Sequence, residues 1–162
     1  MNDIEKKMEA LKAEFLGKLE ELQKEAEEQE ALKPWKPKTE EQYFFVKDSF
    51  YASGYWNEND EVDNHNFEIG NCFRTKERAE QVAKKMRLLL RLERLHDMLC
   101  PDYEPDWEDC RLKFDVYFNC EQGNWTVSGS SFCKKPCMVA FDTKGNAEKA
   151  AEILNKEMGE SE

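Results

Sequence analysis

Two stretches of the chain read almost alike, FRTKERAEQVAKKM at Phe73–Met86 and FDTKGNAEKAAEIL at Phe141–Leu154, and they begin 68 residues apart. In each, a phenylalanine stands two residues before a threonine, and small apolar residues then recur at helical spacing. Three pairs keep the same offset: Ala79 and Ala147, Ala83 and Ala151, Met86 and Leu154. We therefore predict N-caps at Thr75 and Thr143, each followed by a helix that packs on a sheet.

Strand-like runs precede both stretches. Aromatic and β-branched runs bounded by turn residues are typical of strands, and six are predicted: 43–48, 50–56, 66–73, 111–118, 124–128 and 138–141. Gly54-Tyr55-Trp56 also lies 69 residues before Gly123-Asn124-Trp125, close to the offset of the helices. The sequence therefore predicts an α+β fold with a duplicated β-β-β-α unit, its helices on one face of a six-strand antiparallel sheet or of two small sheets. Coincidence is the alternative, because Thr-Lys-x-x-Ala-Glu is a common helix start.

Residues 1–32 predict one long helix, because Ala, Leu, Lys, Glu and Gln dominate this segment. Its apolar positions form one stripe with an eleven-residue repeat: Ile4, Met8, Leu11, Phe15, Leu19, Leu22 and Ala26. A stripe this narrow on so polar a helix needs a surface to cover it. We expect self-association into a homodimer. Docking on the body of the same chain is the alternative, and Gly17 weakens the middle of the helix.

The remainder of the chain divides by composition. Prolines on both sides of Trp35 end the first helix and begin a connector over residues 33–42. We expect the first β-β-β-α unit over 43–99, an acidic connector over 100–109 and the second unit over 110–158.

Charge and cysteine content restrict the class of protein. The net charge of −11 over 162 residues argues against a general nucleic-acid binder and against binding to anionic membranes. The N-terminus has no apolar run of signal-peptide length, so we expect a cytoplasmic protein with reduced cysteines. Among the six cysteines only Cys133 and Cys137 are closely spaced, and Cys120 or a histidine would have to complete a zinc site. We therefore expect no metal and no cofactor.

Three motifs together resemble small accessory proteins of phages and prophages of Gram-positive bacteria. They are Trp35-Lys36-Pro37-Lys38, then Tyr43-Phe44-Phe45-Val46, then the run from Gly70 to Ala83, GNCFRTKERAEQVA. The likeness covers about residues 33–99, and its motifs are structural, so they transfer no catalytic or binding residue. The resemblance implies an interaction role in the host cytoplasm. Inhibitors of bacterial defence such as anti-CRISPR proteins have this size and acidity.

Two charged clusters are candidate contact surfaces. Acidic residues concentrate in a loop of the first unit and in the acidic connector: Glu58, Asp60, Glu61, Asp63, Asp102, Glu104, Asp106, Glu108 and Asp109. Set among aromatic residues, they would suit a basic groove by mimicking phosphates and bases; solvated loops with the aromatics turned inward are the alternative. Basic residues form a stripe on the first repeat helix: Lys84, Arg87, Arg91 and Arg94. That stripe would bind a nucleotide or nucleic acid, meet a partner protein, or be solvated or paired within the chain.

No motif predicts catalysis. The two histidines, His65 and His96, have no nucleophile placed beside them by a recognisable motif, and the sequence has no phosphate-binding glycine loop and no H-E-x-x-H. We therefore expect a non-catalytic protein that blocks a host defence protein or ribonucleoprotein complex through its acidic loops or N-terminal helix. The alternative is a module that binds nucleic acid or a small nucleotide through the basic stripe.

Overall fold

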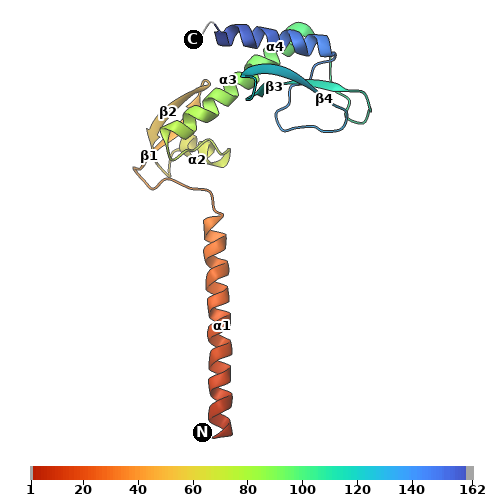
Figure 1. Ribbon diagram of the computed structural model, residues 1–162. Coiled ribbons are helices and arrows are strands. Elements are labelled where there is room, and N and C mark those ends of the chain that lie inside the picture. Colours follow the sequence, from red (N-terminus) through yellow and green to blue (C-terminus); the bar gives the residue numbers. More distant parts are fainter. Residues whose placement is uncertain (1, 160–162) are drawn as a thin grey trace. The chain divides into compact units, whose positions relative to one another are not determined.

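The computed structural model describes residues 2–159, in which four helices and two antiparallel two-stranded sheets are found (Figure 1). The elements in chain order are α1 (Asp3–Ala31), β1 (Gln42–Lys47), β2 (Phe50–Tyr55), α2 (Glu61–Glu68), α3 (Lys76–Leu99), β3 (Lys113–Asn119), β4 (Asn124–Ser130) and α4 (Lys144–Gly159). The predicted α+β class and the long N-terminal helix are confirmed. No described helix is long and apolar enough to cross a membrane.

Two compact units divide the chain. One comprises Met1–Tyr43 with Tyr55–Arg74, and the other comprises Phe44–Gly54 with Thr75–Glu162. Each unit therefore draws on two separate segments of the sequence. The boundaries cut through the β1–β2 hairpin and fall directly before α3.

In the first unit the connector and the start of β1 surround an aromatic cluster. Tyr43 is fully buried, and its ring meets the ring of Trp56 edge-on with centroids 5.7 Å apart. Trp56 in turn meets Phe67 of α2 at 6.1 Å, and the ammonium of Lys36 lies 5.2 Å from the Trp56 ring. The backbone N–H of Glu40 donates to the carbonyl of Trp56 at 2.9 Å. These contacts hold the proline-rich connector on the aromatic cluster.

The predicted strand over residues 66–73 is wrong, because helix α2 covers the first part of that range. Asp60 caps α2 by accepting hydrogen bonds from the N–H groups of Val62 and Asp63, at 2.8 and 3.2 Å. The chain leaves the helix through Gly70, whose φ of +75° favours glycine. The cap and the glycine stop thus outweigh the alternating pattern of Asn66–Phe73.

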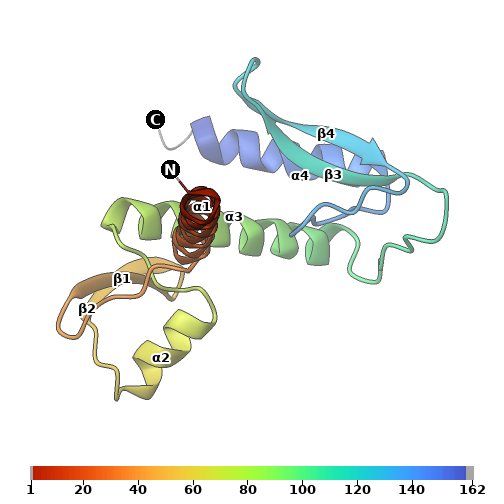
Figure 2. The ribbon, with the colours of Figure 1, turned by 90° about the horizontal axis from the view of Figure 1, so that it is seen from below.

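In the second unit the β3–β4 hairpin has a different covering on each face. The register pairs Phe114 with Gly129 and Val116 with Val127. Figure 2 shows α4 running along the hairpin, and Figure 1 shows residues 131–140 on the side away from α4. Apolar residues pack between α4, the hairpin and α3: Leu95, Cys100, Val116, Val139, Phe141, Ala147, Ala150, Ala151 and Leu154.

The predicted strand over 138–141 is reduced to a single bridge. Phe141 exchanges both backbone hydrogen bonds with Phe114, at 2.7 and 3.3 Å. Pro136 and Cys137 directly precede this segment, and Cys137 has a φ of +57°. Neither residue fits a strand, so backbone pairing with β3 is limited to Phe141.

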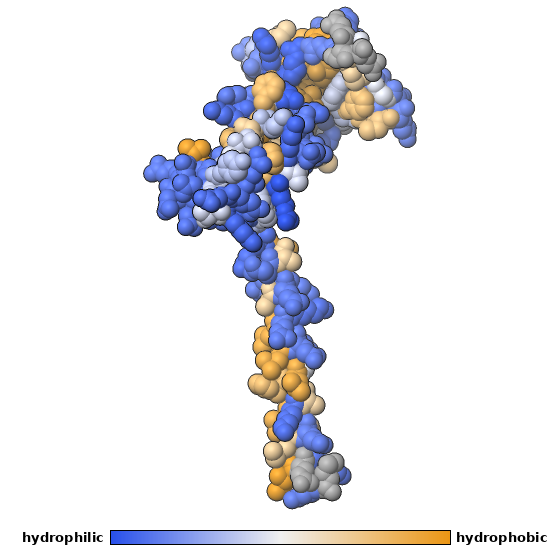
Figure 3. All heavy atoms as spheres, turned by 90° about the vertical axis from the view of Figure 1, so that its left-hand side faces the viewer, coloured by the Kyte–Doolittle hydropathy of each residue, from blue (hydrophilic) through white to orange (hydrophobic). Residues whose placement is uncertain are grey.

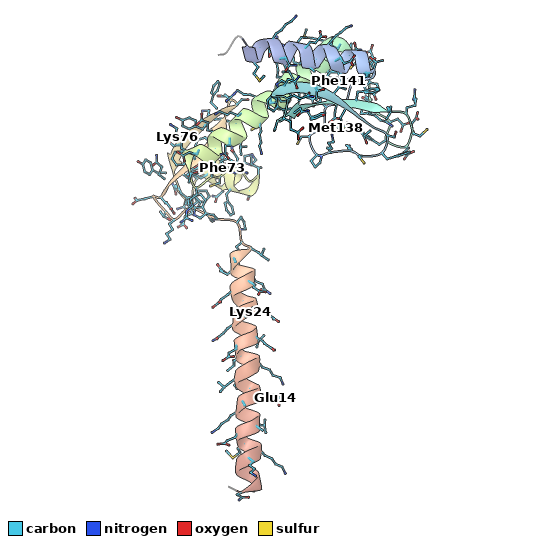
Figure 4. The ribbon with its side chains drawn as sticks, viewed as in Figure 1. Glu14, Lys24, Phe73, Lys76, Met138 and Phe141 are labelled. Atoms are coloured by element: carbon cyan, nitrogen blue, oxygen red, sulfur yellow. The ribbon has the colours of Figure 1, made fainter. Side chains whose placement is uncertain are left out.

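The repeated phrase folds as expected at the two helix starts. Thr75 accepts a hydrogen bond from the N–H of Arg78 at 3.3 Å, and Thr143 accepts one from Asn146 at 3.2 Å. Both predicted N-caps are therefore confirmed. Figure 4 labels the phenylalanine that precedes each of these caps in the sequence, Phe73 and Phe141.

The apolar positions of the repeat agree in part. The four alanines of the repeat are all buried: Ala79, Ala83, Ala147 and Ala151. Met86, however, is 42% exposed, whereas Leu154 is 6% exposed. The two tryptophans 69 residues apart also differ in position, because Trp56 follows the end of β2 whereas Trp125 is near the start of β4. Their common offset therefore does not place them at matching positions of the two hairpins.

Candidate binding surfaces

Helix α1 carries an uncovered apolar stripe. All described side chains of this helix are exposed, and the six residues predicted for self-association are 40–66% exposed: Ile4, Met8, Leu11, Phe15, Leu19 and Leu22. Figure 3 shows apolar side chains over the N-terminal and middle parts of the helix, whereas the part nearest the connector is mostly hydrophilic. Leu16, which the repeat pattern missed, is 59% exposed and lines a shallow hollow of about 470 Å³ with Leu11 and Phe15.

Charged side chains of α1 pair mainly along the helix itself. Lys18 contacts Glu14 at 2.6 Å. Glu14 is labelled on α1 in Figure 4. Lys24, also labelled there, lies 3.9 Å from Glu28. Exposed pairs at this spacing contribute only a few tenths of a kcal/mol each. They support the helix but leave its apolar stripe without a cover.

Two carboxylates in the acidic loop of the first unit stabilise the fold. Asp63 accepts hydrogen bonds from the Tyr43 hydroxyl at 2.5 Å and from the N–H of Asn57 at 2.8 Å. Burial, followed by the hydrogen bond to Asp63, raises the pKa of Tyr43. Asp60 is the cap of α2, so two of the four candidate carboxylates stabilise the fold. Glu58 and Glu61 remain exposed.

The acidic connector presents its carboxylates to solvent in alternation with half-buried residues. Four acidic side chains are exposed: Asp102, Glu104, Asp106 and Glu108. Tyr103 and Trp107 lie between them and are half-buried. The fifth candidate, Asp109, binds Arg111 through Nε at 2.5 Å. The backbone N–H of Arg111, and then its guanidinium, lower the pKa of Asp109. The outward carboxylates and the inward aromatic rings therefore coexist in this segment.

A small hollow lies beside the acidic connector. It holds about 140 Å³ and is lined by Tyr103, Asp109, Arg111 and Asp142 among others. Sites for drug-sized ligands are usually 300–1,000 Å³ and largely apolar. Both the size and the charged lining therefore make this hollow a poor site for a nucleotide.

Three of the four basic stripe residues on α3 have partners within the chain. Lys84 lies 3.6 Å from Glu80. Arg87 donates to the carbonyl of Ser49, and its guanidinium lies 5.0 Å from the Phe50 ring centroid. Arg91 binds both carboxylate oxygens of Glu157, through Nε at 3.2 Å and through a second nitrogen. Arg94 is exposed. This arrangement favours internal pairing over a phosphate site.

The histidines and cysteines do not gather into a centre in residues 2–159. His65 is exposed in the last turn of α2, whereas His96 packs near Phe141 and contacts the carbonyl of Tyr103 at 3.1 Å. Cys133 and Cys137 are both exposed. In this part of the chain no group of three or more His, Cys, Asp or Glu side chains is placed to hold a metal ion.

Comparison of the chain with protein-family models, curated proteins and solved structures finds no match. The functional conclusion therefore depends on the surfaces described above.

Proposed function

We propose that this chain is a non-catalytic cytoplasmic binding protein that pairs through α1 with a second copy and blocks a host defence protein or ribonucleoprotein complex. The uncovered stripe of α1 is the observation that carries the proposal. Seven large apolar residues lie exposed along a helix of 29 residues, which is about 44 Å long. Soluble monomers rarely expose contiguous apolar patches beyond a few hundred Å², so this stripe needs a covering partner.

A second copy of α1 suits the stripe by charge as well as by apolar character. Residues 3–17 hold three lysines and four acidic residues, a net charge of −1, whereas residues 18–31 hold two lysines and six glutamates, a net charge of −4. An antiparallel pair would therefore set each glutamate-rich half against the nearly neutral half, whereas a parallel pair would bring the two glutamate-rich halves together. We infer an antiparallel homodimer.

The acidic connector supports a protein partner with a basic groove. Its four outward carboxylates are available for contact, and the internal pairing of Arg87 and Arg91 leaves little of the basic stripe for phosphates. The resemblance of residues 33–99 to phage accessory proteins supports a role against bacterial defence, with the host cytoplasm as its compartment.

We also propose that the body arose by duplication of a shorter unit than β-β-β-α. Each copy would comprise a hairpin, a bridging phenylalanine and a threonine-capped helix, that is, β1–β2 with α3 and β3–β4 with α4. Phe73 and Phe141 both have bridge backbone pairing, three residues before the first residue of the following helix. The two copies would differ in their third element, which is α2 in one and the irregular segment 131–140 in the other.

Sedimentation equilibrium tests the pairing of α1. Leu11→Glu with Phe15→Glu places two charges in the stripe and is expected to give a monomer, because charges in an apolar seam are costly to bury. Ala13→Glu with Gly17→Glu adds the same charges at the same spacing outside the stripe and is expected to leave the dimer intact. A wild-type protein that remains monomeric at roughly 100 µM, a concentration at which even weak dimers form, would refute the pairing.

Protection of a targeted phage from CRISPR immunity in a Gram-positive host tests the inhibitory role. Wild-type protein is expected to restore plaque formation, and Glu104→Lys with Glu108→Lys is expected to abolish the effect. Glu93→Lys with Glu121→Lys makes the same charge change at exposed positions elsewhere and is expected to have no effect. Affinity capture after nuclease treatment should retain the host protein. Recovery of nucleic acid alone would overturn the proposal.

A further inference from the structure

The outer edge of β4 carries backbone groups that point away from the hairpin. In β3, Phe114 uses its N–H and carbonyl on the opposite edge, where it pairs with Phe141. Phe114 and its cross-strand neighbour Gly129 therefore form a non-hydrogen-bonded pair. Hydrogen-bonded and non-bonded pairs alternate along an antiparallel ladder, so Val127 and Trp125 belong to the same class as Gly129. The N–H and carbonyl groups of these three residues face outward.

Asn155 of α4 shows how that edge accepts a partner. The N–H of Trp125 donates to Oδ1 of Asn155 at 2.7 Å, and Nδ2 of Asn155 donates to the carbonyl of Trp125 at 2.9 Å. One side-chain amide thus makes both hydrogen bonds that a residue of an added strand would make. In the described residues no such partner faces Val127 or Gly129.

A groove of about 390 Å³ lies beside this edge, between β4 and α4. Val127 and Ala151 provide small apolar surface, and the carboxylates of Glu148 and Glu152 line the α4 side. Glu148 is paired with Lys144 at 3.2 Å. Glu152 is exposed and forms no ion pair within residues 2–159. The groove therefore combines a strand edge with a carboxylate that is free to meet a cation.

We propose that this groove binds an extended segment of a partner protein as an added strand, with a lysine or arginine of that segment turned toward Glu152. Two residues of the segment, two positions apart, exchange backbone hydrogen bonds with Val127 and Gly129. Side chains alternate between the two faces of the added strand, and one set lies toward α4, where Glu152 recognises a basic group. Edge-to-edge pairing of two copies of this chain is disfavoured, because Lys144 in each groove is paired with Glu148, so neither copy offers an unpaired cation of the groove to the other copy's Glu152. The proposal stands on β4 and α4 alone and does not depend on α1.

Nuclear magnetic resonance on the full-length, ¹⁵N-labelled protein tests this assignment with one probe, acetyl-Val-Lys-Val-Lys-Val-Lys-amide. Binding is expected to shift the amide signals of Val127 and Gly129 and to slow their hydrogen exchange. Before peptide is added, both amides are expected to exchange faster than those of Thr126 and Ser128, which face β3. Glu152→Lys is expected to weaken binding by about fivefold or more, whereas Glu93→Lys on α3 leaves it unchanged.

Two methylated forms of the probe separate strand addition from simple charge attraction. One carries N-methyl groups on the three lysines and the other on the three valines. An added strand turns only one of these sets toward β4, so one form is expected to lose binding and the other to keep it. Equal behaviour of the two forms would overturn the proposal, as would unshifted Val127 and Gly129 signals with the unmethylated peptide. Concentration-dependent protection of these amides without peptide would assign the edge to a second copy.

Discussion

Asp115 of β3 alternates with Val116, which belongs to the core with α4, and it forms an ion pair at 2.6 Å with Lys135 of the loop that follows β4. Asp115 is 6% exposed and also accepts a hydrogen bond from Ser128 at 2.7 Å. Two residues earlier, Lys113 is 2% exposed and donates to the carbonyls of Asp109 and Ser131. Two buried charges of opposite sign therefore hold the acidic connector and the 131–140 loop on one face of the hairpin.

Lys135→Ala is expected to lower the free energy of unfolding by about 1–2 kcal/mol, because the nearly buried carboxylate of Asp115 would keep only Ser128 as a partner. Urea unfolding followed by circular dichroism measures the change. Lys134→Ala removes a neighbouring exposed lysine and is expected to change stability by less than about 0.5 kcal/mol. Equal losses in the two variants would contradict a specific role for the ion pair.

Asn155→Ala is expected to destabilise the second unit by about 1 kcal/mol, because the edge groups of Trp125 would exchange an intramolecular partner for water. Hydrogen exchange at the Trp125 amide should become faster in this variant. Glu152→Ala lies on the same helix and serves as the control, with no effect expected at Trp125. An unchanged exchange rate in Asn155→Ala would show that the amide bonds do not persist in solution.

Stability at alkaline pH is expected to depend on Tyr43 and Cys72. Burial is the main cause that raises both pKa values in the fold, that of Cys72 to about 11 from an ordinary value of 9.0. The folded state therefore favours the protonated groups. Their contribution is complete below the unfolded pKa values and is lost as the pH rises, between 9 and about 11 for Cys72 and above 10 for Tyr43.

Unfolding titrations at pH 7, 9 and 10.5 test this dependence. Cys72→Ala should reduce the loss of stability between pH 9 and 10.5. Tyr43→Phe should cost about 1–2 kcal/mol at pH 7, because the hydrogen bond to Asp63 is lost, and should lessen the decline above pH 10. Tyr55→Phe, at an exposed site, should leave the pH profile of the wild type unaltered. A profile that none of the three variants changes would contradict the assignment.

Alkylation by iodoacetamide at pH 8 should divide the six cysteines into two classes. The four exposed thiols should react first: Cys110, Cys120, Cys133 and Cys137. Cys72 and Cys100 should react at least about tenfold more slowly, because burial hinders access and raises the pKa of both thiols. Mass spectrometry of digested protein measures the order. Joint protection of Cys133 and Cys137 that a chelator relieves would reveal a bound metal ion.

Gly17→Ala is expected to stabilise α1 by up to about 1 kcal/mol, because alanine is the better helix former and the added methyl group would meet no other atom within 4 Å. Gly17 lies on the helix face opposite the apolar stripe, at roughly 100° per residue, so the substitution should leave the dimer interface unchanged. Circular dichroism should show that the variant keeps more of its helicity on heating than the wild type does. Gly17→Pro should break the helix and reduce dimerisation, and a dimer unaffected by that change would refute pairing along α1.

The sequence allowed the helix starts to be predicted because their determinants are local. Thr75 and Thr143 each cap the N–H three residues ahead, and the alanines that follow occupy one helix face. The segment 66–73 was predicted wrongly because its alternation resembles a strand. The competing signals are Asp60, a cap that lies before that range, and Gly70, a helix stop within it. The helix signals, a cap and a stop, together outweighed the alternation that favours a strand.

The candidate surfaces could be predicted only as sets of residues. Helical spacing places Arg87 and Arg91 on one stripe, but the Ser49 carbonyl and Glu157 lie 38 and 66 residues away in the chain. Such partners are set by tertiary packing. The edge of β4 depends on which pairs of the ladder are hydrogen-bonded, and that is fixed by the single Phe114–Phe141 bridge. No local pattern of Val127 or Gly129 contains that information.

The separation of α1 from α4 along the chain has a consequence during translation. Residue 31 ends α1 and residue 144 begins α4, so 112 residues are added between them. At about 5–20 residues per second, that interval lasts roughly 6–22 s. Ala147, Ala150 and Leu154 of α4 belong to the core of the second unit, which therefore closes only after α4 emerges. On a polysome, neighbouring nascent chains would have this interval in which to join through α1 before their bodies are folded.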